Sequence, residues 1–395
     1  MAANTLEFNQ ISTVLNSIVS QATGKAAITP TNTSEFVTVA QTGLKTGYDN
    51  LLSAVSQVLS RTIFSNRPYS RKFKGLEADA IRYGNHVRKL QIADKDAEND
   101  DRLPLTDGKS VDQQVVSKPT ILQTNFYGSN SYQRHYTIFK DQLDVAFSGP
   151  DEFAQFIALI TQNCSDMIEQ EHENLARFTI DNYIAGVYVG ANVSLKTSQI
   201  VHLLTEYNAQ TGLTLTDTSV YDPANYSAFM KWVYARVAAV SAMLTERSLV
   251  YHTNFIGKEV SRHTPERDQR VYILAQNRFG TEARVLADTY HDNYLKTAVN
   301  EYVNFWQSIK TPAEINVSPT YMNTNGVLVT PSKAVDLKNV FGVIMDREAA
   351  GYTVVNQWSG TSPFNQRGGY QNIWFHFTDR YWNDFTENGV IFLLD

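Results

Sequence analysis

The chain has 395 residues, a formal net charge of −6, 43% hydrophobic residues and 19% charged residues. That length provides for one large domain, or two to three modest ones, with a substantial core. The sequence shows no basic stripe of the kind that reads DNA and no 18-residue apolar run that would span a membrane, and its single cysteine excludes an intramolecular disulfide.

The first 65 residues are predicted to form two amphipathic helices joined by a polar link. Apolar side chains recur at helical spacing over 5–20 and again over 40–62, and the segment TPTNTS lies between them at 29–34. Helices on such a link leave their apolar stripes uncovered. We therefore expect both to dock on the main body or on a neighbouring chain.

Residues 66–130 predict an extended β-hairpin with a charged tip. The arms RKFKGLEADAIRYGNHVRKLQI and VVSKPTILQTNFYG are strand-like, and the acidic segment ADKDAENDDRLPLTDGKSVDQQ separates them. A two-stranded hairpin alone is marginally stable in water. We expect this projection to lie on another surface.

A long helix is predicted to follow, over about 150–186. The segment SGPDEF supplies a cap, a proline suited to the first helical position and two acids suited to the positive helix end. About 35 residues at 1.5 Å each span about 50 Å. The apolar stripe contains Phe153, Ile157, Ile160, Cys164, Met167, Glu171, Leu175 and Phe178.

The rest of the chain mixes helices and strands. A helix begins at YDPANY, with Asp222 as cap, and a shorter helix follows Gly280. Strands are predicted at RVYILAQ, NVFGVIMD, GYTVVNQW, QNIWFHFT and GVIFLLD, and the last four are predicted to form one antiparallel sheet. Helices and strands are segregated rather than alternating, which indicates an α+β fold.

Three residues of the long helix are candidates for a hydrolase or metal site: Glu169, His172 and Glu173. A zinc-binding helix places a second histidine four residues after the first, but Ala176 occupies that position. The favoured interpretation is a solvated helix face. Glu171 lies on the apolar stripe of the long helix. We expect its carboxyl group to have either a raised pKa or an arginine partner.

The acidic tip and a nearby GKS segment each resemble part of a known binding motif. DKDAEND at 94–100 resembles the start of a calcium loop, but Asn99 and Leu105 stand where glycine and glutamate are needed. GKS at 108–110 lacks the earlier glycine of a phosphate loop. We predict no enzyme activity and no catalytic, cofactor or metal site.

Two blocks of the sequence carry a family resemblance. RKFKG, YGNHVRKLQI and KPTILQTNFYG form the first, and NVFGVIMDREAAGY with RGGYQNIWFHFTDRYWNDFTENGVIFLL forms the second. The chain resembles the major capsid proteins of tailed bacteriophages, which have the Hong Kong 97 fold. Both blocks resemble those of small short-tailed phages (podoviruses) of Gram-positive hosts. The resemblance covers nearly the whole chain.

That resemblance implies a division of the chain into five regions. They are an N-terminal arm at 1–65, an extended hairpin loop at 66–130 that overlaps a neighbouring subunit, a peripheral domain with the spine helix at 131–194, an axial domain at 195–335, and a C-terminal sheet of the peripheral domain at 336–395. We expect neither an added immunoglobulin-like domain, nor a cleaved N-terminal segment, nor a covalent cross-link.

The function implied is that of a structural protein of the virion. Pentamers and hexamers of the chain would form an icosahedral or prolate shell around double-stranded DNA, without sequence readout and without a membrane. Assembly would take place in the host bacterial cytoplasm with a scaffolding protein and a portal protein as partners. The alternative is another virion component, such as a portal or tail protein.

Self-assembly calls for contacts between subunits, and charged residues of the hairpin are the first candidates. Basic residues on one hairpin strand are expected to pair with acids of a neighbouring subunit. The candidate contacts are Arg82, Arg88, Lys89, Asp94, Asp96, Asp100, Asp101 and, on the long helix, Glu171.

Overall fold

A computed structural model describes residues 8–25, 29–45, 50, 54, 72–78, 86–95, 97–102, 105–194, 197–276 and 301–395. Its helices are α1 (Phe8–Thr23), α2 (Thr33–Leu44), α4 (Lys140–Ala146), α5 (Pro150–Ser194), α6 (Leu203–Thr211) and α7 (Pro223–Leu244). The larger strands are β1 (Val87–Ile92), β2 (Ile121–Phe126), β3 (Ser129–Phe139), β5 (Gln269–Leu274), β11 (Val340–Asp346), β12 (Ala350–Thr361), β13 (Tyr370–Asn383) and β14 (Gly389–Leu393). The short strands are β4 (Ile200–His202), β6 (Glu301–Val303), β7 (Ile315–Val317), β8 (Tyr321–Met322), β9 (Leu328–Val329) and β10 (Val335–Leu337).

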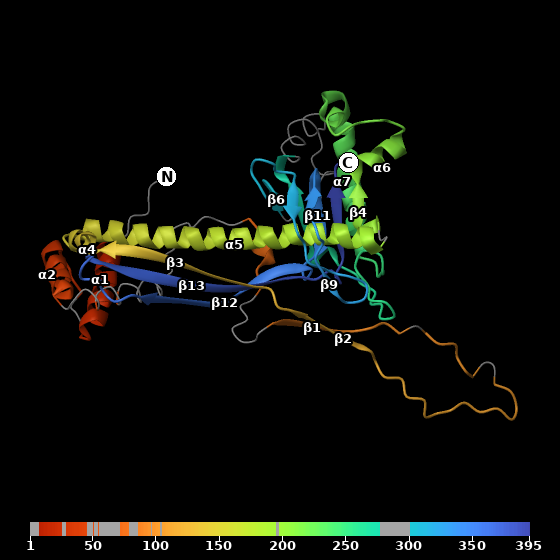
Figure 1. Ribbon diagram of the computed structural model, residues 1–395, viewed down its shortest axis with the longest axis horizontal. Coiled ribbons are helices and arrows are strands. Elements are labelled where there is room, and N and C mark those ends of the chain that lie inside the picture. The colour runs from red at the N-terminus through yellow and green to blue at the C-terminus, as the bar shows by residue number, and fades with distance from the viewer. Residues whose placement is uncertain are drawn as a thin grey trace.

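Helix α5 is the axis of the molecule, and the other elements are arranged along it (Figure 1). It has 45 residues, about 68 Å at 1.5 Å each, and so is longer than the predicted 150–186. The helix continues past Gly186 because Val187 and Ala191 extend its buried face. Phe178, predicted on the apolar stripe, is instead 49% exposed, and its ring packs edge-on against Tyr381.

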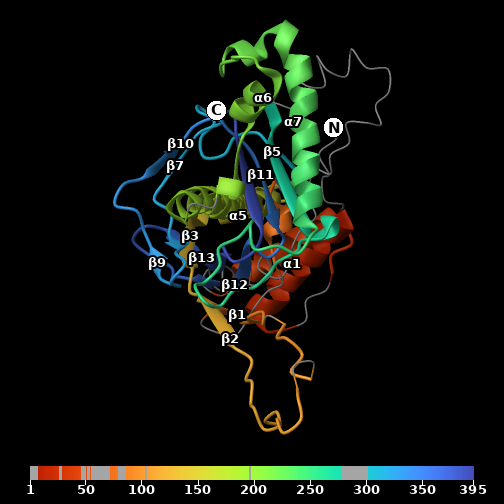
Figure 2. The same ribbon diagram turned by 90° about the vertical axis from the view of Figure 1, so that its right-hand side faces the viewer.

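A five-stranded sheet in the order β4-β14-β11-β5-β6 crosses the C-terminal half of α5. Side chains of β11 alternate between its faces: Val343 and Met345 join the core that contains α5, whereas Phe341 and Ile344 join the core that contains α6 and α7. Helices therefore cover both faces of this sheet, as Figure 2 shows from the end of α5.

A second, three-stranded sheet in the order β12-β13-β3 runs beneath α5 (Figure 1). The prediction that the last four strands form one sheet is therefore wrong, because β11 and β14 belong to the five-stranded sheet. The burial of the strands gives the reason. Five residues of β14 in a row are buried, as a sheet covered on both faces requires, whereas β13 alternates buried and half-buried positions.

Helices α1 and α2 pack on the N-terminal end of α5, where Leu15, Ile18, Phe36 and Phe153 share one core. The second helix begins earlier than predicted, at Thr33, because the side chain of Asn32 caps it by accepting a hydrogen bond from the Glu35 N–H. TPTNTS thus contains a cap as well as a link. Most of the remainder of the predicted 40–62 helix, after Leu44, lies outside the described residues.

Helix α7 confirms its sequence signals. It begins at Pro223 after Asp222, and its predicted stripe residues Phe229, Val233, Val237, Val240 and Leu244 are all buried. The helix predicted after Gly280 lies outside the described part of the chain. Within that described part, no helix combines the length and apolar character needed to cross a bilayer.

Candidate functional site

Strands β1 and β2 form a hairpin that projects from the body of the molecule (Figure 1). They pair antiparallel over six residues, from Val87 opposite Phe126 to Ile92 opposite Ile121. The predicted arms, 71–92 and 115–128, were longer, but residues 72–78 and 115–120 form no strand, and 79–85 lie outside the described residues. The hairpin therefore consists of a short paired root and a long loop.

The two faces of the root differ in character. Leu90, Ile92 and Ile121 point outward and are 59%, 61% and 65% exposed; we call these three residues the outer hairpin face. On the opposite face, Lys89 and Gln91 lie beside buried Leu122 and Thr124. This division follows from the two-residue period of a strand. The outer hairpin face is therefore apolar surface exposed to water, and it does not stabilise the single chain.

Lys89 forms ion pairs within its own chain. Its ammonium contacts the carboxylates of Asp384 and Glu387, in the turn between β13 and β14. Both acids are buried, and burial raises the pKa of Glu387, an effect that Lys89 and Arg262 partly offset. Lys89 therefore has two partners in its own chain, and its contact with a neighbouring subunit stays a prediction.

Asp94 is attached to the body in the same way. Its carboxylate accepts the Ser261 N–H and pairs with Arg247, each at 2.6 Å, and its own N–H donates to the Glu259 carbonyl at 2.9 Å. The Ser261 hydrogen bonds, and then the nearby cations, hold the pKa of Asp94 below its usual range. This residue too is used inside its own chain.

The remaining hairpin candidates have different surroundings. Arg88 is exposed on the side of the outer hairpin face. Asp100 pairs with Arg102, two residues away, and hydrogen bonds from Arg102 lower the pKa of Asp100. Asp101 is exposed in the loop. Arg82 and Asp96 lie outside the described residues. Contacts of all these residues with another subunit stay a prediction.

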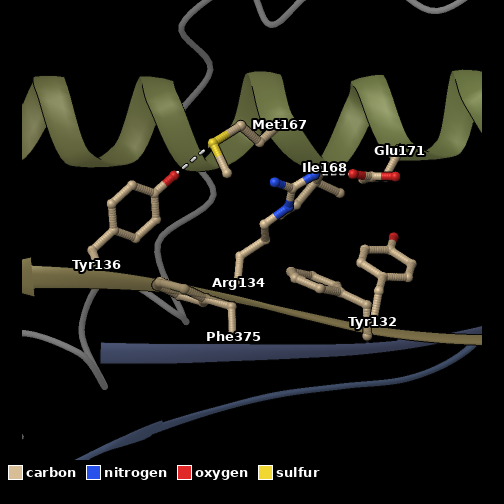
Figure 3. A pocket seen from close by; sticks show the side chains of 8 residues that line it. Tyr132, Arg134, Tyr136, Met167, Ile168, Glu171 and Phe375 are labelled. Carbon is tan, nitrogen blue, oxygen red and sulfur yellow. Dashed lines mark hydrogen bonds and ion pairs between the residues drawn. The ribbon is translucent and has the colours of Figure 1, made fainter. Parts of the chain in front are cut away.

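Glu171 contacts Arg134 of β3, so the arginine partner was the correct alternative. Figure 3 shows this pair in the lining of a small pocket between α5 and the three-stranded sheet. The pocket is lined by Tyr132, Arg134, Tyr136, Met167, Ile168, Glu171, Phe375 and Phe377. Glu171 therefore joins helix to sheet within the chain.

The two residues after Glu171 are buried, so the prediction of a solvated helix face is wrong. Glu173 pairs with Arg177 at 2.5 Å and accepts the Lys72 N–H at 2.6 Å. His172 Nε2 lies 3.6 Å from a carboxylate oxygen of Asp379 in β13. Lys72 and Asp379 of β13 thus lie against this part of the helix. Among the described residues, no three His, Cys, Asp or Glu side chains are placed to hold a metal ion.

Sequence reasoning missed the acids that hold the hairpin. Asp384 and Glu387 lie in NDFTENG, which reads only as a turn, and they are about 295 residues from Lys89. Local patterns cannot show such a pairing. The Glu173–Arg177 pair could have been predicted from the sequence, because residues four apart are neighbours on one face of a helix.

Comparison with known proteins gives one family and a fold. A family model described as Phi29-like phage major capsid protein matches residues 13–393. A chain in "Structure of head fiber and inner core protein gp22 of native bacteriophage P68" is similar in structure, with a TM-score of 0.50, 10% identity, and 85% of this chain and 87% of that chain covered. This likeness supports the mixed α+β fold.

Two other capsid structures match less closely. The capsid of Staphylococcus phage Andhra has a TM-score of 0.49 at 10% identity, covering 85% of this chain and 87% of that one. The mature capsid of bacteriophage PhiM1 has a TM-score of 0.41 at 9% identity, covering 84% and 89%. No curated protein matches the sequence.

Proposed function

Because this chain belongs to the Phi29-like phage major capsid proteins, we propose that its shell is built from pentamers and hexamers in which the outer hairpin face of one subunit lies on the next. A major capsid protein forms the phage head and is a component of the virion. Its role is structural and not enzymatic. The pentamers, the hexamers and the hairpin contact belong to the proposal.

The exposed outer hairpin face is the observation that supports this contact. Leu90, Ile92 and Ile121 are each more than half exposed on a two-stranded ribbon, although burying apolar surface stabilises by about 25 cal/mol per Å². Val115 and Val116, in the loop, are 76% and 77% exposed. One side of the hairpin is attached to its own chain, and the other side is apolar and exposed. This arrangement is consistent with burial of the outer hairpin face against a second copy of the chain.

The proposed shell is icosahedral or prolate and is assembled in the host bacterial cytoplasm. A scaffolding protein and a portal protein are the proposed partners, and the enclosed cargo is double-stranded DNA. A net charge of −6 fits a container that does not grip phosphates, since tight phosphate binding relies on Lys and Arg. We propose no sequence readout for this contact.

Replacing two residues of the outer hairpin face tests the assembly proposal. The variant Leu90→Ser with Ile92→Ser should stay folded, because both side chains are already in water, and should form no closed shells. The control Ile309→Ser changes an even more exposed aliphatic residue, 75% accessible, on a turn of the body. Electron microscopy and sedimentation after expression with the scaffolding protein give the result. Shells of normal yield from the double variant would contradict the proposal.

The charge prediction for Arg88 is tested separately from Lys89. Reversing Lys89 would also break ion pairs inside its own chain, so its effect on assembly has two causes. Arg88→Glu changes only an exposed side chain and should lower the yield of particles while leaving the monomer folded. Normal particles from this single variant would remove Arg88 from the candidate contacts.

A further inference from the structure

We propose that a set of charged and polar side chains at the base of the hairpin fixes its direction relative to the body, with Arg262 and Glu387 as positioning residues. We call this set the root clamp; it consists of Lys89, Gln91, Asp94, Arg247, Arg262, Asp384, Thr386 and Glu387. The inference rests on the proposed function only for its consequence in assembly. The clamp itself is a property of the single chain.

The inner attachment of the clamp is buried. Lys89 is 17% exposed, and its partners Asp384 and Glu387 are 2% and 8% exposed. Ions removed from water in this way are little screened by salt, and breaking the pair leaves a buried charge without compensation. The inner attachment therefore persists at physiological ionic strength.

Arg262 joins three parts of the chain at this point. Its Nε donates to the Thr386 carbonyl at 3.1 Å, one terminal nitrogen contacts the Gln91 amide oxygen, and the other lies 3.3 Å from the Glu387 carboxylate. Gln91 Nε2 in turn donates to the Thr386 hydroxyl at 3.2 Å. One guanidinium thus connects β1, the turn after β13 and the loop before β5.

A second attachment lies farther along the hairpin. Asp94 is five residues beyond Lys89, about 16 Å at the rise of an extended strand, and it contacts Arg247, Ser261 and Glu259. One attachment would let the hairpin pivot, whereas two separated attachments define a direction. The second is the weaker of the two, because Arg247 is 64% exposed and its ion pair is screened by salt.

The charges of the clamp are balanced. Lys89, Arg247 and Arg262 face Asp94, Asp384 and Glu387, three cations against three anions. Apolar packing adds little at this place, since the inner face of β2 contributes Leu122 as its one buried aliphatic residue. The direction of the hairpin therefore depends on polar contacts, so conservative neutral substitutions can release it.

Spin-label distances in the unassembled full-length chain test the clamp without any assembly. One label is attached at Lys118→Cys, just before β2, and the other at Thr218→Cys, in a background where the single native cysteine is changed by Cys164→Ser. The unaltered clamp should give one narrow distance distribution. Arg262→Gln together with Arg247→Gln should at least double its width. The matched control Arg267→Gln, whose side chain is 85% exposed near the same loop, should leave the width unchanged.

Hydrogen exchange gives a second readout on the same variants. The Asp94 amide, which donates to Glu259, should exchange at least tenfold faster when both arginines are changed, while amides of α7 keep their protection. If Arg262→Gln does not fold, Arg247→Gln alone remains informative, because its side chain is mostly in water. Unchanged distance width and unchanged exchange in folded variants would overturn the clamp. That result would leave the Leu90 and Ile92 test of assembly unaffected.

Discussion

Arg134 of β3 and Glu171 of α5 form an ion pair that ties the three-stranded sheet to the long helix. Glu171 was a candidate for contact between subunits, and its partner belongs to its own chain. The pair lies at the rim of the pocket in Figure 3, with Arg134 48% exposed and Glu171 24% exposed.

We expect this pair to contribute modestly to stability. Half-exposed ion pairs typically contribute about 0.2–1 kcal/mol, because solvent screens them and both side chains lose entropy. A double-mutant cycle with Glu171→Gln and Arg134→Gln, followed by urea denaturation of the unassembled chain, measures the coupling free energy. A coupling above about 2 kcal/mol would show that the site is drier than its exposure indicates.

The neighbouring pair of Glu173 and Arg177 should behave differently because both side chains are buried. Glu173→Gln leaves the guanidinium of Arg177 without its carboxylate, beside the carbonyl of Phe305. We expect a loss of about 3–5 kcal/mol in the free energy of unfolding. The control Asp101→Asn removes an exposed acid and should change it by less than about 0.5 kcal/mol. Equal effects of the two variants would contradict this prediction.

Asp181 should make stability depend on pH. Burial raises the pKa of this α5 carboxyl to about 7, an effect that nearby Arg177 partly offsets. Between about pH 4 and pH 7 the folded chain keeps a proton that the unfolded chain has lost. Stability contributed by this proton is therefore complete below the unfolded pKa and is lost as the pH rises through 7, at up to about 1.4 kcal/mol per pH unit.

The variant Asp181→Asn removes this titration. Its melting temperature should exceed that of the unaltered chain at pH 8, and the difference should shrink towards pH 5. Thermal unfolding of the unassembled chain across this range provides the comparison. A difference that grows as the pH falls would mean that the carboxylate is stabilised in the folded state, contrary to the expected sign.

Two glycines one helical turn apart in α5 should respond oppositely to alanine. A Cβ at Gly186 would lie 2.5 Å from the Phe385 ring, which stacks on Tyr183, so Gly186→Ala should cost about 1–3 kcal/mol. A Cβ at Gly190 would lie 3.7 Å from Tyr321, an ordinary contact. Gly190→Ala should then stabilise by up to about 1 kcal/mol through helix propensity. Melting temperatures that shift in the same direction would refute the packing argument.

Local signals in the sequence were sufficient for several elements. Asp222 and Pro223 marked the start of α7, and the three- and four-residue spacing of its apolar side chains gave its buried face. Strand β3 was not predicted, because its residues are mostly polar. Ser129, Gln133 and Thr137 face solvent, and the strand shows little alternation of polar and apolar residues. Position in the sheet, rather than propensity, makes it a strand.

Pairings between distant segments could not be predicted from the sequence. Nothing in the local pattern of β11 and β12 shows that two strands so close in sequence belong to different sheets. Likewise, Lys89 was expected to pair with acids of a neighbouring subunit, and nothing in the local sequence indicates its ion pairs with Asp384 and Glu387 of its own chain. The partners are set by tertiary packing, which a single sequence leaves unspecified.

The strict alternation in β1 has a consequence for the quality of particles. If this strand slipped by one residue against β2, Leu90 and Ile92 would turn towards Asp384 and Glu387, and Lys89 would turn into solvent. The same error would then remove both the buried ion pairs and the apolar surface offered to a neighbour. Under the proposed hairpin contact, a wrongly folded subunit would thus lack the surface through which it joins its neighbours.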